Sequence, residues 1–186
     1  SSRRYPYINF KPKREPGDVI LKVENLSKKN EQGEYLFKNL FLSFNKGEKI
    51  AVFSRNAQAI TAFFNILAGQ DKDFEGEFQY GQTISVQYLP NDNSEYFSGD
   101  QDMTLIDWLR QYSKDKDESF IRGFLGRMLF GGEEVFKRSG VLSGGEKVRC
   151  MMSKIMLSNP NFLIMDKPTN HLDLESITAL NNGMQE

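Results

Sequence analysis

The sequence predicts an α/β fold, and three features lead to that prediction. Short apolar runs typical of strands are concentrated in the first half of the chain. Apolar residues with helical spacing follow them. Near the end, a glycine turn leads into a helix and then into an apolar strand. A chain of 186 residues, 39% of them hydrophobic, is long enough to form one domain with a sizeable core.

The first half contains most of the predicted strands, which cover residues 19–23, 36–44, 50–53, 76–80 and 83–89. The last two are expected to form a further strand pair. Residues 45–48 predict a turn between the second and third strands. A helix through Phe63, Phe64, Ile66 and Leu67 is expected to end near Gly69, because glycine commonly ends helices.

The second half is predicted to be mainly helical. Residues 104–137 contain apolar side chains with helical spacing, namely Leu105, Trp108, Leu109, Phe120, Phe124 and Met128. The charged run at residues 113–117 breaks this block and predicts a solvated loop. A helix at 146–157, a buried strand at 162–165 and the start of another helix follow.

Composition narrows the class of protein. A formal net charge of -1 gives no preference for nucleic acid or membrane as a partner of the whole domain. No apolar run is long enough to span a bilayer, and the opening segment lacks the apolar core of a signal peptide. The single cysteine, Cys150, excludes an intramolecular disulfide and is expected to be a buried apolar residue on a helix. These features predict a soluble, cytoplasmic protein.

Residues 1–17 differ in texture from the rest and are predicted to be an arm or the end of a linker, with the folded domain at 18–186. The segment combines three prolines with basic and aromatic side chains, namely Arg3, Arg4, Tyr5, Tyr7, Phe10, Lys11, Lys13 and Arg14. Two interpretations stay open. The segment could contact RNA through phosphates and base stacking, or it could pack on its own domain.

Two segments near the C-terminal end carry chemistry. The first, directly before a helix, consists of Leu142, Ser143, Gly144, Gly145 and Glu146. Its turn exposes backbone N–H groups at the positive end of the helix dipole, which suits a phosphate. The second is the apolar strand 162–165 followed by Asp166, which brings a carboxylate to a magnesium ion at the sheet edge. It continues as Lys167, Pro168, Thr169, Asn170, His171, Leu172 and Asp173.

In this order and spacing, the two segments resemble the signature motif, the Walker B strand and the D-loop (residues 170–173) of ABC ATPases. The runs PTNHLDLES, VLSGGEKVR and FIRGFLGRMLF resemble the ABC-F branch in particular. Members of that branch are soluble chains with two ABC domains joined by a linker, and many act on the ribosome. The resemblance covers nearly the whole chain.

The resemblance implies a P-loop NTPase-like (RecA-like) core with an antiparallel β subdomain and a helical subdomain at about residues 104–140. It also implies that residues 1–17 end the linker before the second ABC domain. ATP and Mg²⁺ are the cofactors of the family, and hydrolysis of ATP to ADP and phosphate is its reaction. Relatives continue beyond Glu186 with the strand of the switch histidine.

The segment that aligns with the Walker A pattern G-x-x-x-x-G-K-[ST] departs from it. It consists of Ser54, Arg55, Asn56, Ala57, Gln58, Ala59, Ile60 and Thr61. Ser54 and Ala59 replace the two glycines, which let the loop wrap around phosphate oxygens. Ile60 replaces the lysine that carries positive charge to the β- and γ-phosphates. Thr61 remains, with Asp166, as a potential magnesium ligand.

Other positions of the same site also depart from the family. Lys167 stands where active relatives have the catalytic glutamate, and a protonated lysine cannot accept a proton from the attacking water. Asn91 stands at the Q-loop position, where glutamine is usual. Near Asn30, where relatives often stack an aromatic ring on adenine, there is none, and Tyr35 is the alternative. Together these losses predict a site that no longer hydrolyses ATP and holds nucleotide weakly or not at all.

Two residues have competing interpretations. His171 is the single histidine, and a structural or interdomain contact is favoured over catalysis. In one interpretation Lys167 neutralises Asp166 or faces solvent, and in the other it binds phosphate in place of the missing Walker A lysine. The interpretation without phosphate is favoured.

The losses all affect this domain's own site, whereas the signature motif at residues 142–146 is intact. In the family, two ABC domains sandwich ATP head to tail, so this motif would complete the site of a partner domain. The resemblance therefore implies two partners: the first ABC domain of the same protein, and the ribosome or its RNA, with no membrane. Two alternatives remain, namely the ATPase subunit of a membrane transporter and an interaction module that does not hydrolyse ATP.

Overall fold

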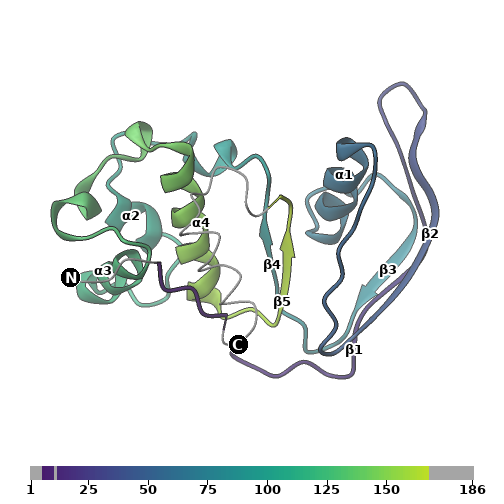
Figure 1. The fold of residues 1–186 in the computed structure, drawn as a ribbon, viewed down its shortest axis with the longest axis horizontal. Coiled ribbons are helices and arrows are strands. Elements are labelled where there is room, and N and C mark those ends of the chain that lie inside the picture. The colour runs from purple at the N-terminus through teal and green to yellow at the C-terminus, as the bar shows by residue number, and fades with distance from the viewer. Residues whose placement is uncertain (1–5, 11, 168–186) are drawn as a thin grey trace. The chain divides into compact units, whose positions relative to one another are not determined.

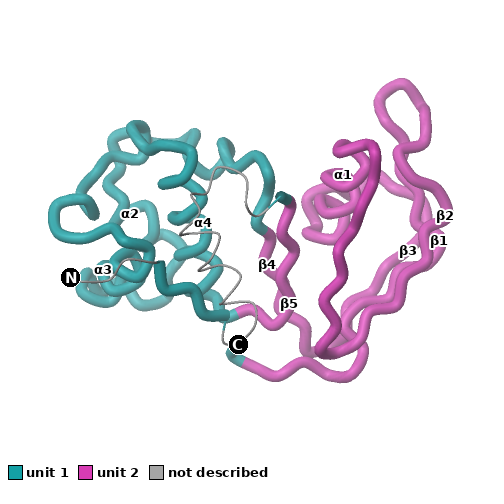
Figure 2. The backbone as a smooth tube through the Cα atoms, viewed as in Figure 1, with its two compact units in different colours: residues 1–13, 89–159, 167–186 teal, residues 14–88, 160–166 magenta. Residues whose placement is uncertain are grey.

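The structure is a computed structural model that describes residues 6–10 and 12–167 (Figure 1). The chain divides into two compact units (Figure 2). The sheet unit consists of residues 14–88 and 160–166, and the helical unit of residues 1–13, 89–159 and 167–186. Each unit has its own core and is described by itself.

A three-stranded antiparallel sheet forms one face of the sheet unit. Its strands are β1 (Val19–Lys29), β2 (Tyr35–Asn45) and β3 (Glu75–Tyr80), in the order β2-β1-β3. The central strand β1 carries most of the buried side chains because it has a neighbour on each side. Its buried apolar residues are Ile20, Leu21, Val23 and Leu26.

Helix α1 (Ala57–Leu67) completes the core of this unit. Phe63, Ile66 and Leu67 are buried in the same cluster as the apolar side chains of β1. The Phe63 ring meets Phe37 of β2 edge to face, with ring centroids 5.9 Å apart. The apolar residues whose spacing predicts this helix are therefore the same residues that pack it against the sheet.

Strands β4 (Val86–Leu89) and β5 (Phe162–Met165) form a second, two-stranded sheet. Asn161 supports its start, because its side-chain oxygen accepts the Ser85 N–H at 2.7 Å and its amide donates to the Thr83 carbonyl at 2.8 Å. Phe162 packs edge to face against Phe44 and Tyr80. These contacts fix the strand that leads to Asp166.

The helical unit contains α2 (Leu105–Arg110), α3 (Glu118–Arg127) and α4 (Gly144–Ser158). One 3-10 turn, η1 (Ser94–Phe97), precedes α2, and two more, η2 (Gly132–Phe136) and η3 (Ser139–Val141), lie between α3 and α4. Each α-helix starts at a residue whose side chain caps it, namely Thr104, Asp117 or Ser143. The fully buried side chains are large and apolar, among them Leu105, Trp108, Leu125, Met128, Phe130 and Met151.

The described residues of the N-terminal arm belong to the helical unit as far as Lys13, and residues 14–17 belong to the sheet unit. The Tyr7 N–H donates to the Arg127 carbonyl at 2.7 Å, and Ile8 is buried. The Lys13 N–H donates to the Asn159 carbonyl at 2.9 Å. These contacts agree with an arm packed on its own domain, and four of its basic or aromatic residues lie outside the described residues, namely Arg3, Arg4, Tyr5 and Lys11.

Two sequence predictions of strands are wrong. Residues 50–53 belong to no strand and are exposed, with Phe53 90% exposed. The apolar side chains make this run suitable for a strand, but suitability alone is not enough. A strand also needs hydrogen-bonding neighbours, and the described residues supply none here. The strands expected near residues 76–80 and 83–89 both form, but β3 pairs with β1 and β4 pairs with β5.

The helical block at residues 104–137 forms in part. The loop at 113–117 separates α2 from α3 as expected, but α3 ends at Arg127 and Leu129 has a φ of 67°. The left-handed residue and the two glycines that follow it explain why no α-helix continues.

Candidate nucleotide site

The sheet unit brings together the two potential magnesium ligands. Thr61 lies in the first turns of α1 and Asp166 follows β5. The Thr61 hydroxyl donates a hydrogen bond of 2.6 Å to Asp166 Oδ2. Asp166 is 2% exposed and makes no ion pair within the described part of the chain. Both groups offer the hard oxygen atoms that Mg²⁺ prefers, so this pair fits two positions of a magnesium shell.

The loop that aligns with Walker A uses its own backbone N–H groups. Asn56 is the N-cap of α1, and its side-chain oxygen accepts the Gln58 N–H at 2.9 Å. The Ala59 N–H donates to the Asn56 carbonyl at 3.1 Å, and the Asn56 N–H donates to Ser54 Oγ at 3.1 Å. Three N–H groups of the segment 54–61 are therefore satisfied within the segment itself.

Lys167 directly follows Asp166 and has an exposed side chain. Its backbone is left-handed, with a φ of 50°, which is uncommon for a residue with a side chain. Within residues 6–10 and 12–167, Lys167 makes no ion pair, so the structure agrees with a side chain that faces solvent.

The signature segment forms the N-terminus of α4, where Ser143 and Glu146 make a reciprocal capping box. The Glu146 N–H donates to Ser143 Oγ at 3.2 Å, and the Ser143 N–H donates to Glu146 Oε1 at 3.1 Å. Lys137 Nζ lies 2.8 Å from Glu146 Oε2. Leu142 is buried beneath this turn, and Ser143 is exposed.

The charge on Glu146 is stabilised in the folded chain. Partial burial acts to raise the pKa of Glu146, but hydrogen bonds from Lys137 and Ser143 outweigh it and lower that pKa below 4.5. The hydrogen bond to Glu146 raises the pKa of Lys137 above 10.5. The turn is thus held by a charged pair as well as by its cap.

The two signature glycines keep their N–H groups available. Gly144 and Gly145 occupy the first two positions of α4, and neither N–H has an acceptor among the described residues. The N–H groups at the start of a helix have no partner inside the helix and bind anions readily. With the Ser143 hydroxyl beside them, they form the arrangement of donors that a phosphate requires.

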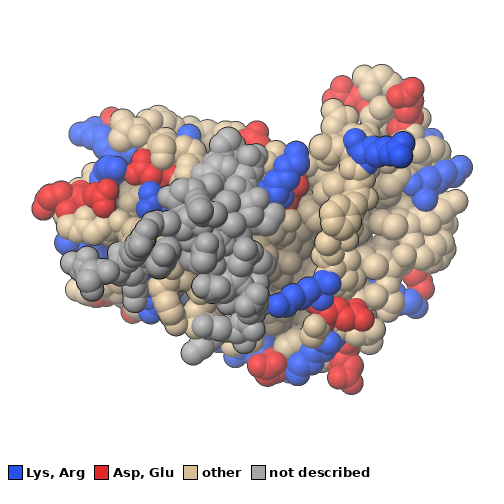
Figure 3. All heavy atoms as spheres, viewed as in Figure 1, with Lys and Arg blue, Asp and Glu red and all other residues tan. Residues whose placement is uncertain are grey.

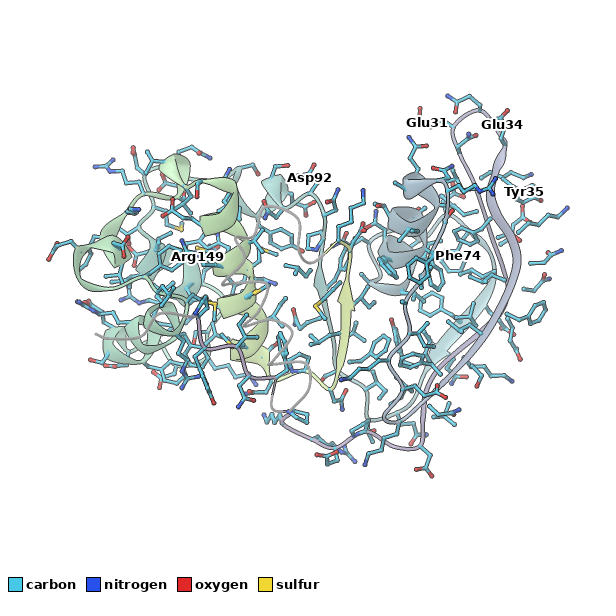
Figure 4. The ribbon with its side chains drawn as sticks, viewed as in Figure 1. Glu31, Glu34, Tyr35, Phe74, Asp92 and Arg149 are labelled. Carbon is cyan, nitrogen blue, oxygen red and sulfur yellow. The ribbon has the colours of Figure 1, made fainter. Side chains whose placement is uncertain are left out.

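The adenine-stacking position has another use in this chain. Asn30 builds the turn between β1 and β2, and its side-chain oxygen accepts the N–H groups of Gln32 and Glu34 at 3.0 and 2.9 Å. Tyr35 follows this turn (Figure 4). The Lys29 and Lys38 ammonium groups each lie 4.8 Å from the centroid of its ring. The Tyr35 ring is therefore already engaged by two cations.

Three other predicted positions can be placed or set aside. Asn91 is half-buried in the helical unit between β4 and η1, next to Asp92 (Figure 4). Cys150 is fully buried on α4, and burial raises the pKa of its thiol to about 12, as expected for an inert apolar residue. The D-loop, which consists of Asn170, His171, Leu172 and Asp173, lies outside the described residues.

Sequence reasoning missed one role and one residue at these sites. It named Asn56 in the Walker A segment but not as the N-cap of α1, which its place directly before an apolar helix could have identified. Lys137 lies nine positions before Glu146 and outside any motif, so only the fold reveals their ion pair.

Comparisons with known proteins decide the family. The profile of the family described as ABC transporter matches residues 37–170, which is more than half of the chain. The chain belongs to the ABC transporter family. The match includes the loop at residues 54–61, the signature segment and Asp166, so the site described above lies in the part that the family shares.

The similar proteins include one that is named as an ABC transporter ATP-binding protein and one that is named for translation. The chain is 58% identical over 185 residues to an uncharacterized ABC transporter ATP-binding protein, YkpA, of Bacillus subtilis, covering 99% of the chain and 34% of that protein. It is 31% identical over 179 residues to the energy-dependent translational throttle protein EttA of Escherichia coli, covering 91% of the chain and 31% of that protein. The chain thus spans about a third of the length of these relatives.

Solved ABC proteins have the same fold. A putative ABC transporter ATP-binding protein from Pyrococcus furiosus matches with a TM-score of 0.69 and 17% identity, over 88% of this chain and 83% of that one. A bacterial ABC transporter cassette, solved as a dimer, matches with a TM-score of 0.67 and 19% identity, over 89% and 80% of the two chains. The predicted ABC nucleotide-binding fold is therefore confirmed, with its antiparallel sheet and its helical part. No helix within the described ranges is both long and apolar enough to cross a bilayer.

Proposed function

We propose that this chain is an ATP-binding-cassette half of an ABC-F-type ATPase whose own nucleotide site is degenerate. Its signature segment would complete the ATP site of a partner ABC domain. The observation that carries this proposal is a contrast between two helix starts. At α1 three of the loop N–H groups and the Thr61 hydroxyl bind groups of the chain itself, whereas at α4 the N–H groups of Gly144 and Gly145 have no acceptor among the described residues.

The nucleotide site of this domain lacks the groups that hold and cleave ATP. To bind phosphates at α1, the loop would have to give up hydrogen bonds that Asn56 and Ser54 accept. Ile60 brings no charge to repay that loss, and charge-assisted bonds are the strong ones in phosphate sites. Thr61 and Asp166 would hold Mg²⁺, which supplies positive charge to bound phosphates when present. Lys167 cannot act as a general base while it is protonated.

The signature turn retains what a partner site needs. Ser143 Oγ accepts one bond from Glu146, which leaves its O–H free to donate to a phosphate oxygen. The open N–H groups of Gly144 and Gly145 add two further donors at the positive end of α4. In a head-to-tail pair, these donors would contact the γ-phosphate of ATP bound on the partner, and hydrolysis there would depend on them.

The rest of the protein would supply that partner. Relatives are about three times as long as this chain, which leaves room for a first ABC domain in the same polypeptide. The resemblance to EttA and to ABC transporter F family member 5 of Arabidopsis thaliana supports a role in translation, with the ribosome as partner and the cytoplasm as location. On the face shown in Figure 3, positive and negative side chains are interspersed, which gives no single-sign surface for RNA.

The test is Ser143→Arg in the full-length protein, with ATP hydrolysis as the readout. We expect the bulky cation to block the signature turn and abolish ATPase activity. Ser119→Arg, at an exposed serine of α3, is the matched control and should leave activity unchanged. Undiminished activity of the Ser143→Arg variant would contradict the proposal.

The second candidate is the ATPase subunit of a membrane transporter, which the family description favours. Purification of the full-length protein distinguishes the two. Association with ribosomes supports the ABC-F proposal, whereas association with membrane-spanning subunits supports the transporter. A full-length protein without any affinity for Mg-ATP would instead be an interaction module.

A further inference from the structure

Two lysines of α4 face aromatic rings of neighbouring elements. Lys147 Nζ lies 5.6 Å from the centroid of the Phe97 ring. Lys154 Nζ lies 5.1 Å from the centroid of the Tyr96 ring and 4.9 Å from that of Tyr112. The two lysines are seven residues apart, so they lie on one face of the helix. We call these two lysines and three rings the cation–π seam.

A tryptophan fixes the rings of the seam. Trp108 stacks on Phe97 with ring centroids 4.8 Å apart and meets Tyr112 edge to face at 5.2 Å. Its indole N–H donates to the Tyr96 carbonyl at 2.8 Å. Trp108 is itself 2% exposed. Trp108 therefore supports the rings of Phe97 and Tyr112 directly and Tyr96 through its backbone.

The lysines have no competing partner in the described part of the chain. Neither Lys147 nor Lys154 makes an ion pair there, although carboxylates are common on this unit. Burial lowers the pKa of Lys154, because the charged ammonium group loses part of its hydration in this position. A lysine without a packing role keeps its ammonium group in water. The position of the Lys154 ammonium group against two rings therefore indicates that the contact has a role in the fold.

The seam joins two parts of the candidate nucleotide machinery. Lys147 belongs to the first turn after Ser143, and its N–H donates to the Ser143 carbonyl at 2.9 Å. Phe97 and Tyr96 belong to η1, which begins three residues after Asn91 at the Q-loop position. The start of α4 is therefore attached to the segment that follows the Q-loop position, through side chains that lie in neither motif.

We propose that Lys147 and Lys154 are positioning residues, which orient the signature turn by holding α4 against η1 through the cation–π seam. This inference rests on the proposed role of Ser143 in the partner's ATP site. The two lysines do not touch nucleotide and act through Ser143. If the seam is lost, α4 can shift along η1 and the three donors of the turn no longer meet the phosphate together.

The test uses the full-length protein with Lys154→Met, which keeps the length of the side chain and removes its charge. We expect kcat for ATP hydrolysis to fall about five- to tenfold, the range that loss of such contacts implies. The KM for ATP should change less than twofold, because ATP first binds the partner domain before the turn closes on it. Lys154→Arg keeps the cation over the rings and should retain activity. Lys114→Met, at an exposed lysine of the same unit, is the matched control.

A double-mutant cycle separates positioning from general stabilisation. In a Ser143→Ala background, Lys154→Met should cause no further loss, since both changes then act on the same contact. Additive losses, or unchanged kcat in Lys154→Met, would overturn the inference. Tyr112→Leu removes one ring while keeping the lysine, and it replaces Lys154→Met if that variant does not fold. If Ser143→Arg leaves ATPase activity intact, the proposed function fails first, and that result is distinct from a failure of the seam alone.

Discussion

At the scale of single residues, the hydroxyl of Thr61 takes on a structural role. Asp166 is a buried carboxylate, and a carboxylate removed from water needs donors to remain stable. In an occupied magnesium site, the metal would compensate for that charge. In this chain Thr61 donates directly to it at 2.6 Å.

Replacement of Thr61 should reveal this role. Thr61→Val preserves shape and removes the donor, so we expect the free energy of unfolding of the chain to fall by about 1–3 kcal/mol. Urea denaturation followed by circular dichroism measures it. Thr61→Ser retains the donor and serves as the control. Equal stability of the valine variant and the unchanged chain would show that Asp166 does not depend on Thr61.

Single residues also show how far sequence reasoning reaches. The pairing of Thr61 with Asp166 was predictable, because both stand at motif positions that share one ion in the family. The use of Asn30 as a turn residue was not recognised, although asparagine often accepts hydrogen bonds from N–H groups two residues onward. It explains physically why no aromatic residue stands there. The exposure of Lys167 depends on its left-handed backbone, which no sequence pattern specifies.

At the scale of elements, the N-terminus of α4 is the best-supported feature of the helical unit. A serine cap, a reciprocal glutamate and an ion pair with Lys137 converge on one turn. All three act to keep the first turn intact while leaving its glycine N–H groups open. An anion site that remains ordered without its anion is what a donor to a partner domain requires.

The ion pair at this turn should make stability depend on pH. The folded chain lowers the pKa of Glu146 below 4.5, so the folded state binds fewer protons than the unfolded state in the acid range. The stabilisation by Glu146 is therefore complete above pH 4.5 and is lost as the pH falls through the folded pKa. We expect Glu146→Gln to destabilise the chain between about pH 6 and 8 and to make little difference in acid.

Denaturant titrations over a pH series check this expectation, with Glu133→Gln at an exposed glutamate as the control. A difference between the chain and Glu146→Gln that stays the same from neutral to acid pH would contradict the role of the charged carboxylate.

Elements with their own local signals were predicted well. Helix α1 was predicted because its apolar spacing matches the face it buries, and α4 because a cap precedes a helical pattern. The partners of β3 and β4 could not be predicted, because strand pairing is decided by segments distant in sequence. The same reason applies to residues 50–53, whose apolar side chains suit a strand that has no described neighbour.

At the scale of the whole molecule, the two units have different relations to nucleotide. The sheet unit holds the loop at residues 54–61 and Asp166, and three N–H groups of this loop and the Thr61 hydroxyl are bonded within the unit. The helical unit holds the signature turn, where the N–H groups of Gly144 and Gly145 have no acceptor among the described residues. Under the proposed function, the full-length protein would hydrolyse ATP at one site of the pair and use the other as a structural contact.

Calorimetric titration of the purified chain with Mg-ATP tests this account most directly, with the full-length protein as the positive control. Because the loop lacks the Walker A lysine and three of its N–H groups are already bonded within the loop, we predict no binding heat for the chain at ATP concentrations up to about 1 mM. The dissociation constant would then exceed about 1 mM, which corresponds to a binding free energy weaker than about 4 kcal/mol. Micromolar binding by the chain would contradict the account. Loss of that binding in Lys167→Met or Arg55→Met would then identify the cation that replaces the missing lysine.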